Sequence, residues 1–216
     1  LGDVYKRQLL GEAVNQACDA LDGIEDGVLN DPRNCDFDPA VLKCEAGKDS
    51  ANCLTSKQVA AVKSIWSGVN NSDGKQVFPG LVPGGEAALG GWSRWVTGSE
   101  PFESLHWHAS EGFFKHMVYQ DTDWDFRGFD YDTDLALVRS KLGPALDSND
   151  PDLGPFRDRG GKLIVYHGWS DADISPLASI DYFERAVSKV AGHDDDTSNL
   201  DEVQDFFRLF MVPGMG

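Results

Sequence analysis

The last third of the chain contains two short apolar runs separated by an amphipathic stretch. Residues 162–168 form a nearly continuous apolar run, which is typical of a strand buried on both faces. Residues 176–190 have the spacing of an amphipathic helix with Pro176 in its first turn, and residues 206–212 form a second apolar strand. This order predicts a parallel βαβ unit, and open α/β sheets place their chemistry at the carboxyl ends of such strands.

The first 155 residues show a different pattern, in which short helices are separated by stretches rich in Gly, Pro and Asp. Thr55 and Gln58 have the spacing of a capping box, and residues 151–161 have the composition of a linker. Residues 1–8 match no pattern downstream. We therefore expect two units, residues 1–155 and residues 156–216. The other expected elements are helices over 9–20, 55–66 and 134–141, extended pieces within 68–91, a partly helical aromatic segment over 92–119 and an acidic loop over 192–201.

Composition excludes two classes of partner. The chain has 216 residues and a formal net charge of −17, so it lacks the basic surface that nucleic-acid binding requires. No apolar run approaches the length of a membrane span. Hydrophobic residues make up 41% of the chain, which is enough for one sizeable core or two smaller ones. We therefore expect neither a nucleic-acid partner nor insertion into a membrane.

The four cysteines all fall within residues 18–53. They form no Cys-x-x-Cys pair and have no histidine nearby, which argues against a zinc site. An even number of cysteines in a loop-rich segment favours disulfides and an oxidising compartment, so we expect a secreted or periplasmic protein. Four cysteines allow three pairings. The sequential pairing, Cys18 with Cys35 and Cys44 with Cys53, closes the shortest loops and is the one we predict.

An acidic loop lies inside the first cysteine pair. Asp19, Asp22 and Asp26 recur at offsets of three and four residues, and Gly23 and Gly27 allow the chain to bend sharply. Calcium prefers six to eight oxygen ligands from carboxylates and backbone carbonyls, which such a loop can turn inward. The pattern is not that of an EF-hand. The alternative interpretation is an acidic surface turn followed by a strand.

Asp171 follows the first strand of the predicted βαβ unit, where an α/β-hydrolase carries the acid of its catalytic triad. Asp173 is an alternative acid, and either residue could be a helix-capping or surface aspartate. No Gly-x-Ser-x-Gly elbow occurs in the chain. His193 lies one strand too early to be the base. His167 either points toward the site or is packed at the strand end and bonds the loop. The chain therefore has a candidate acid without an evident nucleophile or base.

Four motifs, in order, make the chain resemble the tannase/feruloyl esterase family, which also includes mono-(2-hydroxyethyl) terephthalate hydrolase. The resemblance extends over about residues 9–216 and includes the C-terminal residues 206–216. The motifs are ACDALDGIEDGV over 17–28 with Asp31, Pro32 and Cys35; CLTSKQ over 53–58; DWDFR over 123–127 with Phe129 and Asp130; and GKLIVYHG over 161–168 with Asp171.

The resemblance implies an α/β-hydrolase with a large lid inserted between its serine and acid segments. Residues 1–155 would be this loop-rich, partly helical lid, and residues 156–216 the C-terminal part of the core. The implied function is that of a secreted serine carboxylic ester hydrolase acting on small aromatic esters, such as feruloyl or galloyl esters. The family's serine precedes the lid, and its histidine directly follows the Gly-Met-Gly motif that ends at Gly216. We therefore expect a fragment that is inactive by itself.

The resemblance also implies roles for individual residues. Asp171 would be the catalytic acid, with His167 at the wall of the substrate pocket and Ile174 just after the acid. A structural calcium ion would bind the lid. Its ligands would be the carboxylates of Asp19, Asp22 and Asp26 and the carbonyls of Ile24 and Val28.

The aromatic residues leave a second function open. Trp92, Trp95 and Trp107 could stack on a ring-shaped ligand, as expected of a non-catalytic, calcium-stabilised extracellular binding module for aromatic or carbohydrate ligands. The same cluster is compatible with a lid over a phenolic acyl group, and Trp95 would then contact the substrate. Because aromatic side chains are mostly core, the cluster does not separate the two hypotheses. A serine upstream and His-Cys directly after Gly216 in the parent gene would establish the enzyme.

Overall fold

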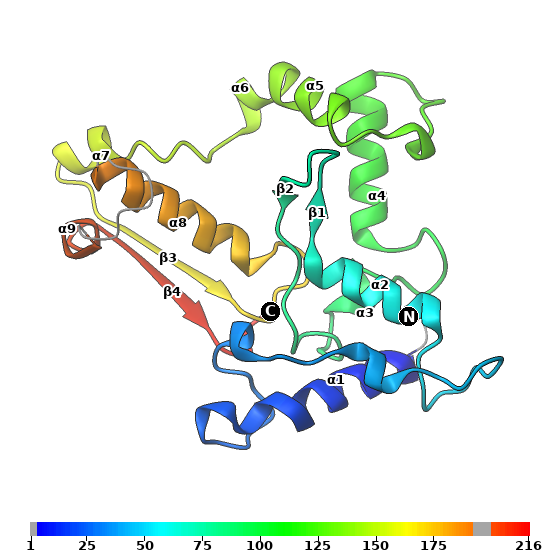
Figure 1. Cartoon of the computed structure of the whole chain (residues 1–216). Helices are drawn as coiled ribbons and strands as arrows, with labels where there is room; N and C mark the ends of the chain where they lie inside the picture. Colours follow the sequence, from blue (N-terminus) through cyan, green and yellow to red (C-terminus); the bar gives the residue numbers. More distant parts are fainter. Residues whose placement is uncertain (1–3, 192–199) are drawn as a thin grey trace.

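The computed structural model describes residues 4–191 and 200–216, and most of its regular structure is helical (Figure 1). His193 and residues 192–199 of the predicted loop lie outside the described residues. The last two residues of that loop, Leu200 and Asp201, begin a helix instead. Within the described part of the chain, no helix is long and apolar enough to cross a membrane. The α-helices are α1 (Val4–Cys18), α2 (Ser56–Ser67), α3 (Trp92–Trp95), α4 (Leu105–Gly112), α5 (Thr133–Lys141), α6 (Gly143–Leu146), α7 (Gly154–Asp158), α8 (Pro176–Ala191) and α9 (Leu200–Gln204).

The strands form two small sheets. β1 (Val69–Asn70) pairs antiparallel with β2 (Gln76–Phe78), and β3 (Leu163–Gly168) pairs parallel with β4 (Phe207–Val212). The parallel register runs from Leu163 opposite Phe207 to Gly168 opposite Val212, so the predicted βαβ unit is confirmed. Short 3₁₀ helices cover Asp19–Asp22, Pro32–Asn34, Pro39–Leu42 and Phe126–Gly128, and a π-helix covers Phe113–Tyr119.

Two apolar clusters hold the elements together. The first lies under α1 and α2 and is centred on Leu10, Val14 and Val62, with Ala172 of the loop after β3 packed into it. In the second, α8 lies along the β3–β4 sheet, and Ala186 and Val187 pack against Phe207 (Figure 1). The loop after β3 therefore lies between the two clusters.

One expectation about β3 is wrong. The apolar run was predicted to be buried on both faces, yet Ile164 is 70% exposed and Tyr166 is 69% exposed. The alternate residues face α8 or lie at the sheet end, and Phe210 of β4 is also exposed beside Tyr166. The physical reason is that α8 covers one face only, and no described element of this chain covers the other.

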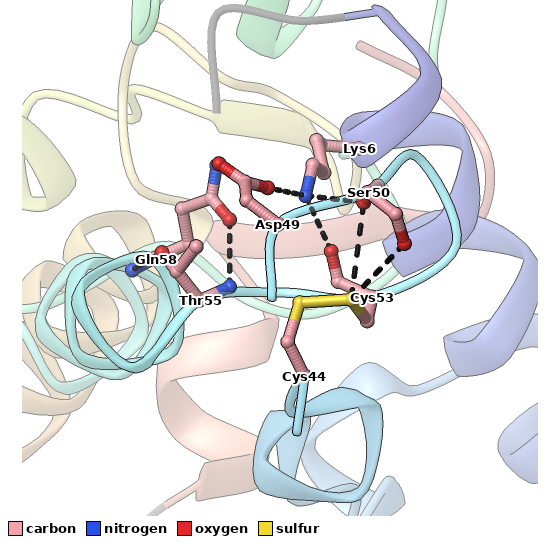
Figure 2. A network of polar contacts seen from close by, with 7 residues as sticks. All are labelled: Lys6, Cys44, Asp49, Ser50, Cys53, Thr55 and Gln58. Carbon is pink, nitrogen blue, oxygen red and sulfur yellow. Dashed lines mark hydrogen bonds and ion pairs between the residues drawn. A yellow bond between two sulfur atoms is a disulfide. The ribbon is translucent and has the colours of Figure 1, made fainter. Parts of the chain in front are cut away.

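The start of the chain also differs from expectation. Residues 1–8 matched no pattern, but α1 begins at Val4 and buries Lys6 to 4% exposure. The Lys6 ammonium donates to the Asp49 carboxylate at 2.7 Å and to the carbonyls of Ser50 and Cys53 at 2.6 and 2.5 Å (Figure 2). A buried lysine with three acceptors is invisible to a hydropathy pattern, which explains the error.

Local sequence chemistry accounts for the helix starts that were predicted. Thr55 accepts a hydrogen bond from the Gln58 amide, and the Gln58 side chain accepts one from the Thr55 amide at 2.8 Å, which completes the capping box of α2 (Figure 2). The linker over 151–161 differs in that it contains α7, which begins at Gly154 with a proline in its first turn.

Candidate active site

The candidate site is built on the loop that follows β3. The Trp169 amide donates to the Val212 carbonyl at 2.9 Å, and the Ser170 amide donates to the Met215 carbonyl at 2.8 Å. A Cβ atom at Gly168 would lie 2.1 Å from the Met215 carbonyl oxygen, so only glycine permits this close approach. The carboxyl ends of the two strands therefore meet, and they bring residues 169–173 next to residues 213–216.

Asp171 is fixed within this loop by its own carboxylate. Its Oδ1 atom accepts hydrogen bonds from the amides of Asp173 at 2.8 Å and Ile174 at 3.1 Å. Its Oδ2 atom lies 3.2 Å from Nε2 of His167. The Asp171 side chain is 30% exposed, so it is anchored by the protein and still reachable from outside.

His167 projects from the end of β3 and is 12% exposed. Its Nδ1 atom lies 2.7 Å from the hydroxyl of Ser179, in the first turns of α8. His167 therefore bonds the loop, which is one of the two alternatives left open by the sequence. Sequence reasoning missed Ser179. A signal was present, because Ser179 is a polar residue in the apolar stripe that α8 continues through Phe183 and Ala186.

Asp173 has a separate environment. Nε2 of His106, which lies on α4, is 2.9 Å from the Asp173 carbonyl oxygen and 3.2 Å from its carboxylate. The Trp95 ring lies 5.8 Å from the His106 ring, centroid to centroid. Trp95 is thus connected to the loop through His106. Ile174, 55% exposed, follows directly on the same loop.

A cavity of about 760 Å³ opens beside Ile174. Ile174 and Ser179 line it together with Val165 of β3. Phe78, the last residue of β2, also lines it, as do Pro79 and Arg139. The cavity is therefore formed by both parts of the chain.

The acidic loop is a series of hydrogen-bonded turns. Both carboxylate oxygens of Asp19 accept from the Gly27 amide, at 3.1 and 3.0 Å. Asp22 accepts from the Ile24 amide at 2.9 Å, and Asp26 accepts from the Val28 amide at 3.0 Å. Among the described residues, no three His, Cys, Asp or Glu side chains are gathered where they could hold a metal ion. The oxygen atoms of Asp19, Asp22 and Asp26 are of a kind that binds hard cations. In this structure, however, each of these carboxylates accepts a hydrogen bond from a backbone amide.

Both predicted disulfides are present in the structure. Cys18 is bonded to Cys35, with 5.4 Å between their Cα atoms, and Cys44 is bonded to Cys53, with 4.9 Å. The first links the end of α1 to the segment after the acidic loop. The second closes the loop whose carbonyls Lys6 contacts (Figure 2).

Glu86 is a buried carboxyl group that the sequence did not single out. Its side chain is 1% exposed, and both its oxygens accept from the Gly84 amide, at 3.2 and 3.0 Å. Burial raises the pKa of Glu86 to about 7, although the hydrogen bond from the Gly84 amide offsets part of this rise. The same turn touches the candidate site, because a Cβ atom at Gly85 would lie 3.0 Å from the Ser170 carbonyl oxygen.

Comparison with known proteins identifies the family. The profile of a family described as "Tannase and feruloyl esterase" matches residues 5–216. The chain belongs to the tannase and feruloyl esterase family. It is 38% identical to an uncharacterized esterase of Xanthomonas campestris pv. campestris over 213 residues, a match that covers 92% of this chain and 37% of that protein. It is 32% identical to feruloyl esterase B of Aspergillus niger over 209 residues, covering 96% of this chain and 37% of that protein.

Solved structures of the family share the fold of this chain. The crystal structure of feruloyl esterase B from Aspergillus oryzae matches with a TM-score of 0.82 at 27% identity, over 99% of this chain and 40% of that one. Tannin acyl hydrolase from Aspergillus niger matches with a TM-score of 0.76 at 26% identity, over 98% of this chain and 41% of that one. The chain thus spans roughly 37% of the length of the curated relatives it matches.

Proposed function

We propose that the protein containing this chain is a secreted or periplasmic serine carboxylic ester hydrolase that acts on small aromatic esters. Membership of the tannase and feruloyl esterase family supports this function over a non-catalytic binding module. Two disulfides that use every cysteine support an oxidising compartment. Residues 156–216 would be the C-terminal part of an α/β-hydrolase core, and residues 1–155 a lid over it.

One observation carries the mechanism: Asp171 lies at the carboxyl end of β3, beside the residues that follow β4. In a Ser-His-Asp mechanism the acid holds the base histidine in the correct tautomer and stabilises its charged form. The two amides on Oδ1 prevent the Asp171 carboxylate from rotating, which suits this task. In this proposal, the serine and the histidine come from other parts of the complete protein.

The substrate would lie against residues of both units. His167, Ile174 and Trp95 are the proposed contacts, and the cavity beside Ile174 has room for an aromatic acyl group. Which aromatic ester is cut depends on this wall, since a pocket discriminates acyl groups through the side chains that contact them.

A structural calcium ion is a further part of the proposal. Its ligands would be the carboxylates of Asp19, Asp22 and Asp26 and the carbonyls of Ile24 and Val28, once the carboxylates exchange backbone amides for the ion. The loop is clamped by the Cys18–Cys35 disulfide. It also touches the site end of the sheet, because a Cβ atom at Gly214 would lie 3.1 Å from Val28. Calcium would therefore stabilise the loop beside the catalytic edge.

Substituting the two competing acids in the complete protein tests the mechanism. Asp171→Asn should leave the fold intact and lower kcat on a simple aryl ester by about 10⁴-fold, as loss of the orienting carboxylate does in other serine hydrolases. Asp173→Asn, which alters only the contact with His106, should have a much smaller effect. If Asp173→Asn is the inactive variant and Asp171→Asn works normally, Asp171 is not the acid.

A further inference from the structure

Three side chains form a continuous polar line from α8 to the candidate acid. The Ser179 hydroxyl lies 2.7 Å from Nδ1 of His167, and Nε2 of His167 lies 3.2 Å from Oδ2 of Asp171. Serine, histidine and aspartate are also the members of a catalytic triad. Here, however, Ser179 lies inside a helix rather than on a strand-to-helix turn that would expose it as a nucleophile. The line therefore needs another explanation.

Hydrogen-bond chemistry fixes the direction of the line. An ionised carboxylate only accepts hydrogen bonds, so the proton facing Asp171 must be on Nε2 of His167. Nδ1 of the neutral ring is then an acceptor, and the hydroxyl of Ser179 is the only group in the line that can donate to it. The Asp171 carboxylate thus selects the tautomer, and the Ser179 hydroxyl, by donating to Nδ1, holds the ring in the plane in which Nε2 donates to Asp171.

The partners of Asp171 show what holding the His167 ring in this orientation achieves. Oδ1 already accepts from two amides, which occupies both of its lone pairs. Oδ2 accepts only from His167 among the described residues, so it keeps one lone pair. If Asp171 orients a base histidine, Oδ2 is the atom that does so, and His167 determines where that lone pair points.

We propose that Ser179 is a positioning residue of the esterase: through Nδ1 of His167 it holds the ring that sets the orientation of Oδ2 of Asp171. This inference rests on the proposed role of Asp171 as the acid. Ser179 lines the cavity proposed for the acyl group, but in this scheme it contacts neither the reacting ester bond nor the base. Its effect on turnover is transmitted by one imidazole ring.

The first test measures the tautomer directly, in the complete protein labelled with ¹⁵N-histidine. The imidazole ¹⁵N shifts of His167, assigned with the variant His167→Gln, should show a protonated Nε2 and an unprotonated Nδ1. Ser179→Ala should leave Nε2 protonated but shift the Nδ1 resonance, because Nδ1 loses its donor, whereas Ser179→Thr keeps the hydroxyl and should restore the original pattern. Ser188→Ala, on the same helix and without a side-chain hydrogen bond among the described residues, is the matched control. An unchanged pattern in Ser179→Ala would overturn the inference, whether or not the protein is an esterase.

The second test measures turnover. Ser179→Ala should lower kcat on an aryl ester by about 10- to 100-fold with little change in KM, because misplaced catalytic groups cost rate rather than binding. Ser179→Thr should recover most of the loss, and Ser188→Ala should resemble the original protein. Equal losses in Ser179→Ala and Ser188→Ala would indicate a merely structural role. Covalent labelling of Ser179 by an aryl phosphonate would make it the nucleophile, and would likewise overturn the inference.

Discussion

At the scale of single residues, Glu86 is a carboxyl group that the fold removes almost completely from water. It is almost fully buried, and its pKa of about 7 lies above the ordinary value of 4.5. Between these two values the folded chain holds a proton that the unfolded chain releases. The free energy of unfolding therefore falls as the pH rises from about 4.5 to 7 and is constant above that range, as far as this group is concerned.

Replacing Glu86 with glutamine should remove this pH dependence. Glu86→Gln keeps an acceptor for the Gly84 amide but carries no charge, so above pH 7 it should be more stable by about 3 kcal/mol, because the pKa rise from 4.5 to about 7 counts 1.36 kcal/mol per pKa unit. Urea unfolding at pH 5 and pH 8 measures the difference. The exposed Glu100→Gln is the control and should unfold like the original protein at both values. A steep fall in stability that persists in Glu86→Gln would assign the pH dependence to another group.

At the scale of elements, the acidic loop after α1 has two candidate arrangements. In the structure each carboxylate holds a backbone amide two to eight residues away in sequence, which makes a self-contained surface turn. In the proposed calcium-bound state the same carboxylates would face one ion. The two arrangements differ in their response to calcium, because an ion that binds only the folded state stabilises it by mass action.

Chelation of calcium should lower the melting temperature of the protein. At a calcium concentration 100 times the dissociation constant, the ion contributes about 2.7 kcal/mol to the free energy of unfolding. Asp22→Asn and Asp26→Asn should abolish the response to chelator, whereas Asp73→Asn, in the turn between β1 and β2, should retain it. An unchanged melting curve in chelator, with no bound metal by elemental analysis, would leave the loop as a surface turn.

At the scale of the whole molecule, the β3–β4 sheet has one bare apolar face. Ile164, Tyr166 and Phe210 are all more than half exposed on it, whereas α8 covers the opposite face. The match to about two fifths of each solved relative places this sheet within a larger fold in those proteins. The proposed activity accordingly belongs to the complete protein.

The chain assayed by itself should therefore show no turnover of an aryl ester above background. A nucleophile and its base act as one unit, so an acid alone contributes almost nothing to the rate. The complete protein, assayed alongside, should hydrolyse the same ester. Turnover by this chain alone would place a nucleophile within it, and its loss in Ser179→Ala but not in Ser188→Ala would then identify that nucleophile.

Features that depend on residues close together in the chain can be predicted without the fold. The capping box at Thr55, the start of α8 at Pro176 and the order β3–α8–β4 all follow from local patterns and turn chemistry. Carboxylate spacing made the acidic loop a candidate calcium site, and the family resemblance then implied the ligands and the role of Asp171. Position relative to a strand end made Asp171 a candidate acid, with Asp173 as the alternative, because parallel strands bring their carboxyl ends to one edge.

Contacts between side chains far apart in the chain depend on how the helices and strands pack. Ser179 reaches His167 because α8 packs on β3, and Glu86 is buried because its turn is enclosed by other elements. Lys6 is buried because three acceptors from residues 49–53 surround it, against the expectation for a charged residue near the start of the chain. The exposed face of β3 also depends on packing, because no described element of this chain packs against it. Hydropathy predicts that an apolar strand will be covered, but whether a cover exists depends on which elements pack against it, and that is a property of the whole fold.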